Sequence, residues 1–267
     1  MSAPTWVLLR GLARERGHWG SLPAWLAARV VPAEVVALDL PGTGARHAER
    51  SPATVDAIVD ACRSELQRRC VAPPYRLLGL SLGGMVALAW SQRFAAEVAS
   101  CIVMNCSARN LGAWHERLRP GKALSLLATR LAGGPRRAEL AVLRCTSADP
   151  QRHAAVVDGW VALRHRHPVA IPNLLRQLLA ASRWRVPDRA PAVPLLLLSS
   201  AGDRLVAPQC THRLAARWGV PHAEHPRAGH DLPLDAPQWV IAQALAFIVL
   251  SPGHHAPVMP AGDDGGR

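Results

Sequence analysis

The fold is decided by the stretch Tyr75-Arg76-Leu77-Leu78-Gly79-Leu80-Ser81-Leu82-Gly83-Gly84, in which a short apolar strand runs into a Gly-x-Ser-x-Gly turn. An apolar helical run, residues 85–90, follows it. This order is typical of a nucleophile elbow, a turn so tight that a side chain at Gly79 or Gly83 would clash. The amides that open the helix then point toward the oxygen of Ser81, where they can hold a developing negative charge. Glycine and serine are also common in ordinary turns, but the flanking strand and helix favour the elbow.

Length and composition point to a single α/β domain. The chain has 267 residues, of which 49% are hydrophobic, and this favours one domain with an insertion over two independent domains. Its longest apolar runs, residues 195–198 and 241–250, are shorter than the roughly 18 residues that a membrane-spanning helix needs. The sequence passes into an apolar strand without the segments of a signal peptide, so we expect a cytoplasmic location.

The cysteines and histidines lack the spacing of a metal site. Histidine pairs such as His165 and His167, or His222 and His225, have no clustered Cys, Asp or Glu partners, so we interpret them as polar surface residues. The cysteines form no Cys-x-x-Cys pair, and we expect them to be reduced and mostly buried. The sequence therefore predicts no metal and no cofactor. The six cysteines are Cys62, Cys70, Cys101, Cys106, Cys145 and Cys210.

The chain is strongly basic, and the excess is local. The formal net charge is +12, and Lys122 is the only lysine among 31 basic residues, which is as typical of compositional bias as of selection for an acidic partner. Residues 107–190 hold 15 basic and 5 acidic residues, a net charge of +10. The only aromatic residues in this segment are three tryptophans. So few aromatic side chains argue against single-stranded nucleic acid as a partner. They are Trp114, Trp160 and Trp184.

Short apolar strands alternate with helices outside residues 107–190. Continuous apolar strands of this kind predict a mostly parallel twisted sheet with helices on both faces. We expect strands at 5–9, 35–39, 75–80, 98–105, 194–199 and 222–226, and helices at 54–69, after residue 83, at 209–218 and at 237–250.

A helical insertion interrupts this alternation. We expect its helices at 111–118, 122–131, 136–145, 153–164 and 171–182, separated by Gly and Pro. A helical segment that leaves a sheet and returns to it is typical of a lid over an active site. The expected organisation is a core of residues 1–106 and 191–250, a helical lid of residues 107–190, and a disordered Pro- and Gly-rich tail of residues 251–267.

Five motifs in this order and spacing make the chain similar to the α/β-hydrolase superfamily. They are Arg10-Gly11-Leu12, Asp39-Leu40-Pro41-Gly42-Thr43-Gly44, Gly79-Leu80-Ser81-Leu82-Gly83-Gly84, Ala201-Gly202-Asp203 and Ala228-Gly229-His230. The chain most resembles small, lidded bacterial serine esterases, over residues 5–106 and 192–250, whereas the lid resembles nothing specific. The resemblance implies an α/β-hydrolase fold and a catalytic triad in the order serine, acid, histidine.

The residue types agree with that order. Ser81 is the expected nucleophile, His230 the general base, and Asp203 the residue that orients and stabilises the imidazolium. Asp203 lies at the end of a predicted strand, and the preceding strand has no carboxylate after it that could take the same role. Asp203 could instead be a turn residue and His230 an ordinary loop histidine. Asp231 and Asp235 lie close to His230 in sequence and are less suitable orienting residues.

Backbone amides of Leu12 and Leu82 are expected to form the oxyanion hole. In the family a His-Gly pair usually precedes the first amide, whereas this chain has Arg10-Gly11. A main-chain donor survives this change, but the shape of the loop is left open, and Arg10 could face an anionic substrate.

Further pocket candidates are His18 and Trp19, beyond the oxyanion loop, and Trp114 in the lid. An ordinary core or surface role for His18 and Trp19 is an equal alternative. Asp39 is interpreted as a residue that holds its own turn.

A serine at the elbow favours acyl transfer to water, because the dehalogenases and epoxide hydrolases of this fold carry aspartate there. We therefore expect a serine hydrolase of the carboxylesterase type (EC 3.1.1), acting on a small-molecule carboxylic ester through an acyl-enzyme. One alternative is a thioesterase or methyl-ester esterase whose basic lid docks an acidic acyl carrier protein or a CoA ester. The others are a lyase that uses the same triad and a non-catalytic binder.

Overall fold

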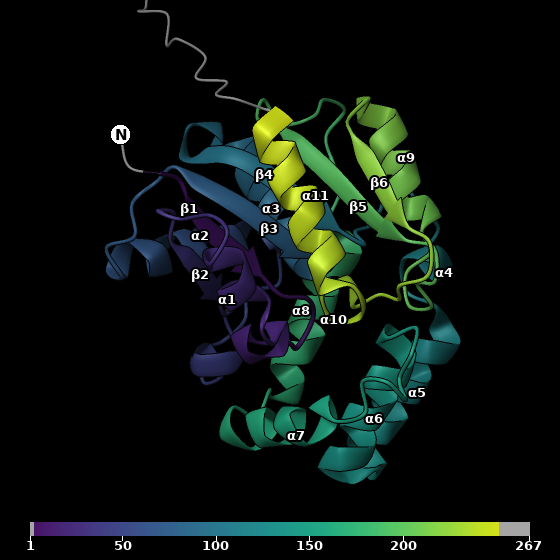
Figure 1. Ribbon diagram of the computed structural model, residues 1–267. Coiled ribbons are helices and arrows are strands. Elements are labelled where there is room, and N and C mark those ends of the chain that lie inside the picture. The colour runs from purple at the N-terminus through teal and green to yellow at the C-terminus, as the bar shows by residue number, and fades with distance from the viewer. Residues whose placement is uncertain (1–2, 251–267) are drawn as a thin grey trace, which may run out of the picture.

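Six parallel strands form one sheet in the computed structural model, which describes residues 3–250 apart from the side chains of residues 123, 127 and 130–132. The strand order is β2-β1-β3-β4-β5-β6 (Figure 1), which confirms the predicted α/β class. The tail predicted to be disordered lies outside the described residues. The strands are β1 (Thr5–Leu9), β2 (Val35–Leu38), β3 (Tyr75–Leu80), β4 (Val98–Met104), β5 (Leu195–Ser200) and β6 (His222–His225).

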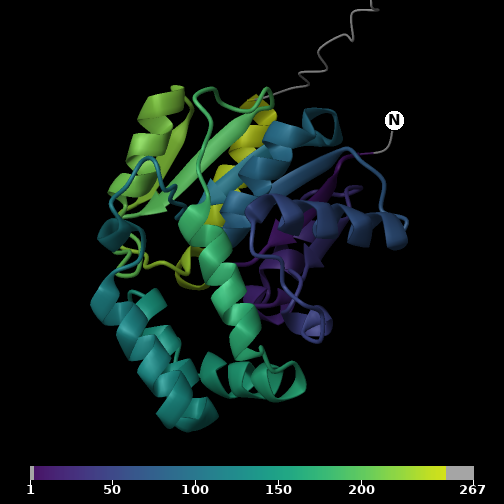
Figure 2. The same cartoon turned by 180° about the vertical axis from the view of Figure 1, so that it is seen from behind.

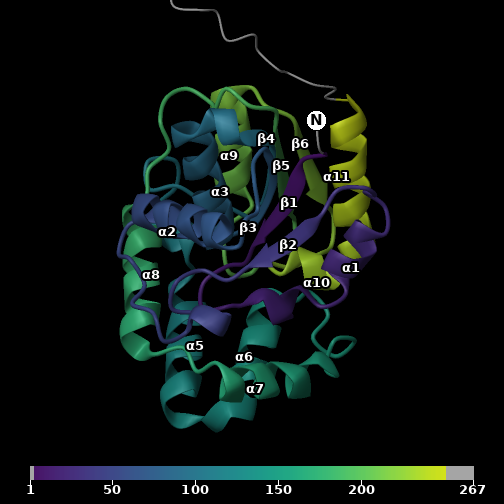
Figure 3. The ribbon, with the colours of Figure 1, turned by 90° about the vertical axis from the view of Figure 1, so that its left-hand side faces the viewer.

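Helices cover both faces of the sheet (Figure 3). One face carries α2 (Val55–Arg68), α3 (Leu82–Arg93) and α9 (Gln209–Trp218), and the other carries α1 (Leu22–Ala27) and α11 (Pro237–Leu250). Short elements connect them: η1 (Arg16–Trp19), η2 (Gly44–Arg46), η3 (Ala95–Glu97) and α10 (Leu232–Asp235).

The strands are apolar throughout because each of their faces packs into a core. In β1, Val7 and Leu9 face the α2 and α3 side, whereas Trp6 and Leu8 face the α1 and α11 side. Successive side chains of a strand point to opposite faces, so a strand that is covered on both sides needs no polar alternation.

The insertion between β4 and β5 lies beyond the carboxyl ends of the strands (Figures 1 and 2). The sequence located its five helices, but the first is reduced to four residues. They are α4 (Trp114–Arg117), α5 (Pro120–Ala132), α6 (Gly134–Thr146), α7 (Val156–Arg166) and α8 (Ile171–Arg183). Proline at the first or second position begins α5, α6 and α8, where its missing N–H has no helical acceptor.

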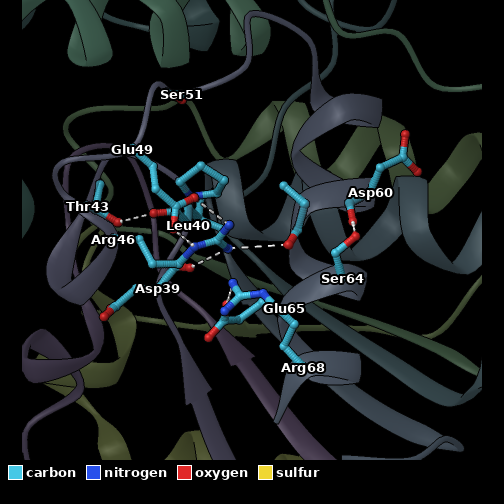
Figure 4. Close-up of polar contacts among 12 residues, drawn as sticks. Asp39, Leu40, Thr43, Arg46, Glu49, Ser51, Asp60, Ser64, Glu65 and Arg68 are labelled. Atoms are coloured by element: carbon cyan, nitrogen blue, oxygen red, sulfur yellow. Dashed lines mark hydrogen bonds and ion pairs between the residues drawn. The ribbon is translucent and has the colours of Figure 1, made fainter. Parts of the chain in front are cut away.

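Side chains hold the turn after β2 (Figure 4). The Asp39 carboxylate accepts the amides of Arg16 at 2.6 Å and Ala45 at 3.0 Å, which confirms that it holds its own turn. The Arg46 guanidinium donates two hydrogen bonds to the Glu49 carboxylate, at 2.9 and 2.7 Å. This turn lies beside the insertion, and its backbone carbonyls accept hydrogen bonds from side-chain amides of α8.

Among the described residues, the structure has no helix with the length and apolar character to cross a membrane.

Candidate active site

Ser81 sits in a strained turn between β3 and α3. Its φ of 56° lies in the left-handed region, and its amide donates to the Met104 carbonyl at 2.9 Å. A Cβ on Gly79 would lie 2.4 Å from the Gly83 carbonyl oxygen, and one on Gly83 would lie 2.1 Å from the Leu9 carbonyl oxygen. The two glycines therefore allow strand and helix to approach closely enough to force the serine into this conformation.

Asp203 and His230 form a buried pair. Asp203 follows β5, His230 follows β6, and the Asp203 Oδ2 to His230 Nδ1 distance is 2.6 Å. The other oxygen of Asp203 accepts the amides of Leu205 at 2.8 Å and Val206 at 2.9 Å. With both oxygens engaged the carboxylate has a fixed orientation, and it selects the tautomer of His230 that carries its proton on Nδ1.

The electrostatics keep the imidazole of His230 basic. Burial by itself would lower the pKa of His230, but the adjacent charge of Asp203 and the hydrogen bond to it outweigh that and raise the pKa above its usual value. With Nδ1 donating to Asp203, Nε2 is the nitrogen left to accept a proton.

Asn105 connects the serine turn to the histidine loop. Its side-chain amide donates to the backbone carbonyl of His230 at 2.9 Å and to the Ser200 hydroxyl at 3.1 Å. The neighbouring Met104 carbonyl accepts the Ser81 amide. Two consecutive residues, the last of β4 and the first after it, thus position both predicted catalytic loops. The sequence offers only a weak signal for the role of Asn105, a polar residue at the end of an apolar strand.

The predicted oxyanion loop lies against the serine. A Cβ on Gly11 would lie 3.3 Å from the Ser81 Cβ and 3.8 Å from its Oγ. Leu82 is the first residue of α3, so its amide has no helical acceptor. The loop is held from α8, where the side chain of Gln177 accepts the Ala13 amide at 2.9 Å.

Arg10 is paired inside the protein, which corrects the expectation that it could face an anionic substrate. It is 2% exposed, and its two terminal nitrogens contact the two oxygens of Asp231 at 3.0 and 2.7 Å. Its guanidinium also lies 4.9 Å from the centre of the Trp19 ring. Burial would raise the pKa of Asp231, but Arg10 outweighs that and lowers it. The pair joins the loop after β1 to the residue beside His230.

The three aromatic pocket candidates lie in different surroundings. Trp19 is 2% exposed and belongs to the core beneath α1 and α11. His18 accepts the Glu15 amide at 3.1 Å and packs against Trp160 of α7. Trp114 departs from the expectation of a pocket residue, because it is 71% exposed on α4, a helix that packs against α9.

Charged contacts tie the insertion to the core near these loops. Glu139 of α6 accepts Arg14 at 2.6 Å and Arg164 at 3.1 Å. Asp235 accepts the Ser147 hydroxyl at 2.6 Å and the Gly229 amide at 2.7 Å, so it holds the insertion against the loop of His230. The two aspartates near His230 therefore have structural partners, and neither takes the place of Asp203.

The cysteines are free, and all but Cys70 are buried, as predicted. Burial raises the pKa of the Cys62 and Cys101 thiols to about 12, so these side chains stay protonated at neutral pH.

Comparisons with known proteins agree with the fold described above. A model of the alpha/beta hydrolase family matches residues 6–243. An enol-lactonase from Burkholderia xenovorans LB400 aligns at a TM-score of 0.76 and 19% identity, over 93% of this chain and 92% of that one. An esterase from Thermogutta terrifontis aligns at 0.73 and 19% identity, over 94% and 91%. The esterase RhEst1 from Rhodococcus sp. ECU1013 aligns at 0.72 and 18% identity, over 92% and 90%.

No curated protein matches the chain by sequence. The structural matches establish the fold, and the family model covers most of the chain with the strand order and the elbow in place. The chain therefore belongs to the alpha/beta hydrolase family.

Proposed function

We propose that the chain is a serine hydrolase that cleaves a carboxylic ester through an acyl-enzyme. The observation that carries the proposal is the buried Asp203–His230 pair at the same sheet edge as the strained Ser81 turn. Parallel strands end at one edge, so the turns after β3, β5 and β6 gather there. A serine, a basic imidazole and an orienting carboxylate are the three groups that nucleophilic acyl transfer needs.

In the proposed reaction, His230 Nε2 takes the proton of the Ser81 hydroxyl as its oxygen attacks the ester carbonyl. Asp203 stabilises the imidazolium that forms. The tetrahedral oxyanion is held by the Leu12 and Leu82 amides, and the imidazolium then protonates the departing alcohol. Water, deprotonated by His230, attacks the acyl group on Ser81, and the acid leaves with the serine restored.

An ester substrate is supported by two further points. The elbow carries serine, which can be acylated by an ester. An aspartate at this position would favour alkyl transfer. Neighbours of the same fold include proteins named as esterases and an enol-lactonase, and each of these names refers to cleavage of an ester bond. The chemistry of the site requires no metal or cofactor.

Labelling with a fluorophosphonate, followed by turnover of p-nitrophenyl esters from acetate to decanoate, tests the proposal. We expect labelling and turnover in the wild type, and loss of about 10⁶-fold in kcat for Ser81→Ala. Ser64→Ala, at an exposed position of α2, is the matched control and should behave as the wild type does. A folded wild type that is neither labelled nor active would overturn the acyl-enzyme. Labelling without ester turnover would favour a lyase that uses the same triad.

The basic insertion bears on the substrate. Arginines such as Arg137, Arg144 and Arg152 are exposed there, and a carrier-linked ester or CoA thioester would bring phosphate or acidic side chains to this surface. Other arginines stabilise the insertion itself. Arg117, for example, donates hydrogen bonds to the backbone carbonyls of Ala181 and Ser182. If a carrier docks here, added salt should reduce kcat/KM for the carrier-linked ester much more than for p-nitrophenyl acetate. Equal salt sensitivity would exclude docking.

A further inference from the structure

A cluster of metal-ligating side chains lies at the sheet edge formed by β6, and the proposed reaction does not use it. His222 and Glu224 come from β6 and His212 from α9, and each offers a ligand atom within 4.8 Å of the others. The alternation of the strand explains the pairing, since residues 222 and 224 share a face while His225 points to the other face and packs against Trp239.

The atoms of this His-His-Glu cluster converge on one point. His212 Nε2 lies 2.5 Å from Glu224 Oε2, and His222 Nε2 lies 2.9 Å from the Ser199 hydroxyl oxygen. That hydroxyl also donates to Glu224 at 2.8 Å. Ser199 is fully buried in β5, so it fixes the inner side of the cluster.

The outer side is open to solvent and has the charge that a cation needs. The side chains of His212 and Glu224 are 41% and 33% exposed. The Glu224 carboxylate offers an anionic ligand oxygen on this side. The next arginines along α9, Arg213 and Arg217, are paired with Glu116 and Asp188.

We propose that His212, His222 and Glu224 form a site for a divalent transition-metal ion of the zinc class, with water as the fourth ligand. Two imidazoles and a carboxylate are a known ligand set for Zn²⁺, which binds them at about 2.0–2.2 Å. Ligands of one tetrahedral ion lie about 3.3 Å apart, so small side-chain rotations would admit it in place of the proton between His212 and Glu224. The ion would join α9 to β6, the two elements that lie between Asp203 and His230 in the chain.

Titration calorimetry with zinc chloride on the full chain tests the site. The background carries Cys70→Ser, His254→Gln and His255→Gln, which removes the exposed cysteine and a histidine pair outside the described residues. We expect one ion per chain and a melting temperature that rises with zinc. His212→Gln, His222→Gln and Glu224→Gln should each weaken binding at least tenfold, whereas His165→Gln, at an exposed position of α7, should not.

Cobalt(II) gives a second readout that does not depend on activity. At the proposed site it should show the visible absorption of tetrahedral nitrogen and oxygen ligands without a thiolate charge-transfer band. Circular dichroism of the metal-free variants establishes that each is folded, and the conservative Glu224→Gln keeps the proposal testable if a histidine variant does not fold. No binding by the background protein, or binding unaffected in all folded ligand variants, would overturn the proposal.

Discussion

Arg10 donates two hydrogen bonds to Asp231, and both side chains are buried, so each charge depends on the other. Asp231→Asn leaves a buried guanidinium unpaired and should cost about 3–5 kcal/mol of unfolding free energy, measured by urea denaturation. Asp158→Asn removes one partner of an exposed pair, Arg136–Asp158, and should cost less than about 1 kcal/mol.

The double variant Arg10→Met with Asp231→Leu distinguishes the contribution of the ion pair from that of side-chain packing. Since both buried charges are removed together, it should recover most of the stability lost by Asp231→Asn. If the double variant is as unstable as the single one, packing against Trp19, and not the ion pair, is the main contribution of Arg10.

The raised pKa of His230 gives a prediction for catalysis. A general base must be neutral, so the acidic limb of the kcat/KM profile should lie above pH 6.5, the usual value for histidine. Asp203→Asn removes the charge that raises the pKa, so the limb should move to lower pH while kcat falls about 10⁴-fold. A limb that stays in place would show that another group controls the rate.

The elbow is the element whose packing leaves the least room. Gly83→Ala would place a Cβ against the carbonyl oxygens of Leu9, at the end of β1, and Arg10, in the predicted oxyanion loop. These are backbone atoms, which cannot rotate away. We expect little folded protein, measured by soluble yield and circular dichroism. Gly159→Ala is the matched control: it lies within α7 with no atom within 4 Å of the new Cβ, and should stabilise the chain by about 1 kcal/mol.

Elements with a strong local pattern were predictable from the sequence. The six strands and the helices of the insertion have apolar runs, prolines and glycines that define them locally. Short elements such as α1 and α10 were missed because their few residues carry no full helical period. Contacts between distant elements have no local signal either, so the role of Asn105 and the convergence of His212 on Glu224 became visible only in the fold.

On the scale of the whole molecule, pH should act through the contact between core and insertion. Burial, together with the charges of Arg14 and Arg10, lowers the pKa of His18 well below its usual range. A histidine held neutral in the folded state contributes stability above pH 6.5, and this is lost as pH falls because the unfolded chain takes up the proton first. We expect a loss of up to about 1.4 kcal/mol per pH unit below pH 6.5.

Unfolding in urea at pH 7.5, 6.5, 5.5 and 5.0 measures this dependence. His18→Gln should show a shallower loss than the wild type over the same pH values, because Gln does not titrate. Equal slopes in the two proteins would show that other groups govern stability in acid.

The Arg10–Asp231 pair also bears on how the protein is made. A ribosome delivers residue 10 long before residue 231, and for most of synthesis the guanidinium has no carboxylate to meet it. The loop that carries it, and with it the proposed oxyanion hole, can take its final shape only after the last strand and the histidine loop have left the exit tunnel. Activity should therefore appear only after Asp231 has been synthesised, and a chain that stalls before Asp231 should be inactive even with β1 to β5 complete.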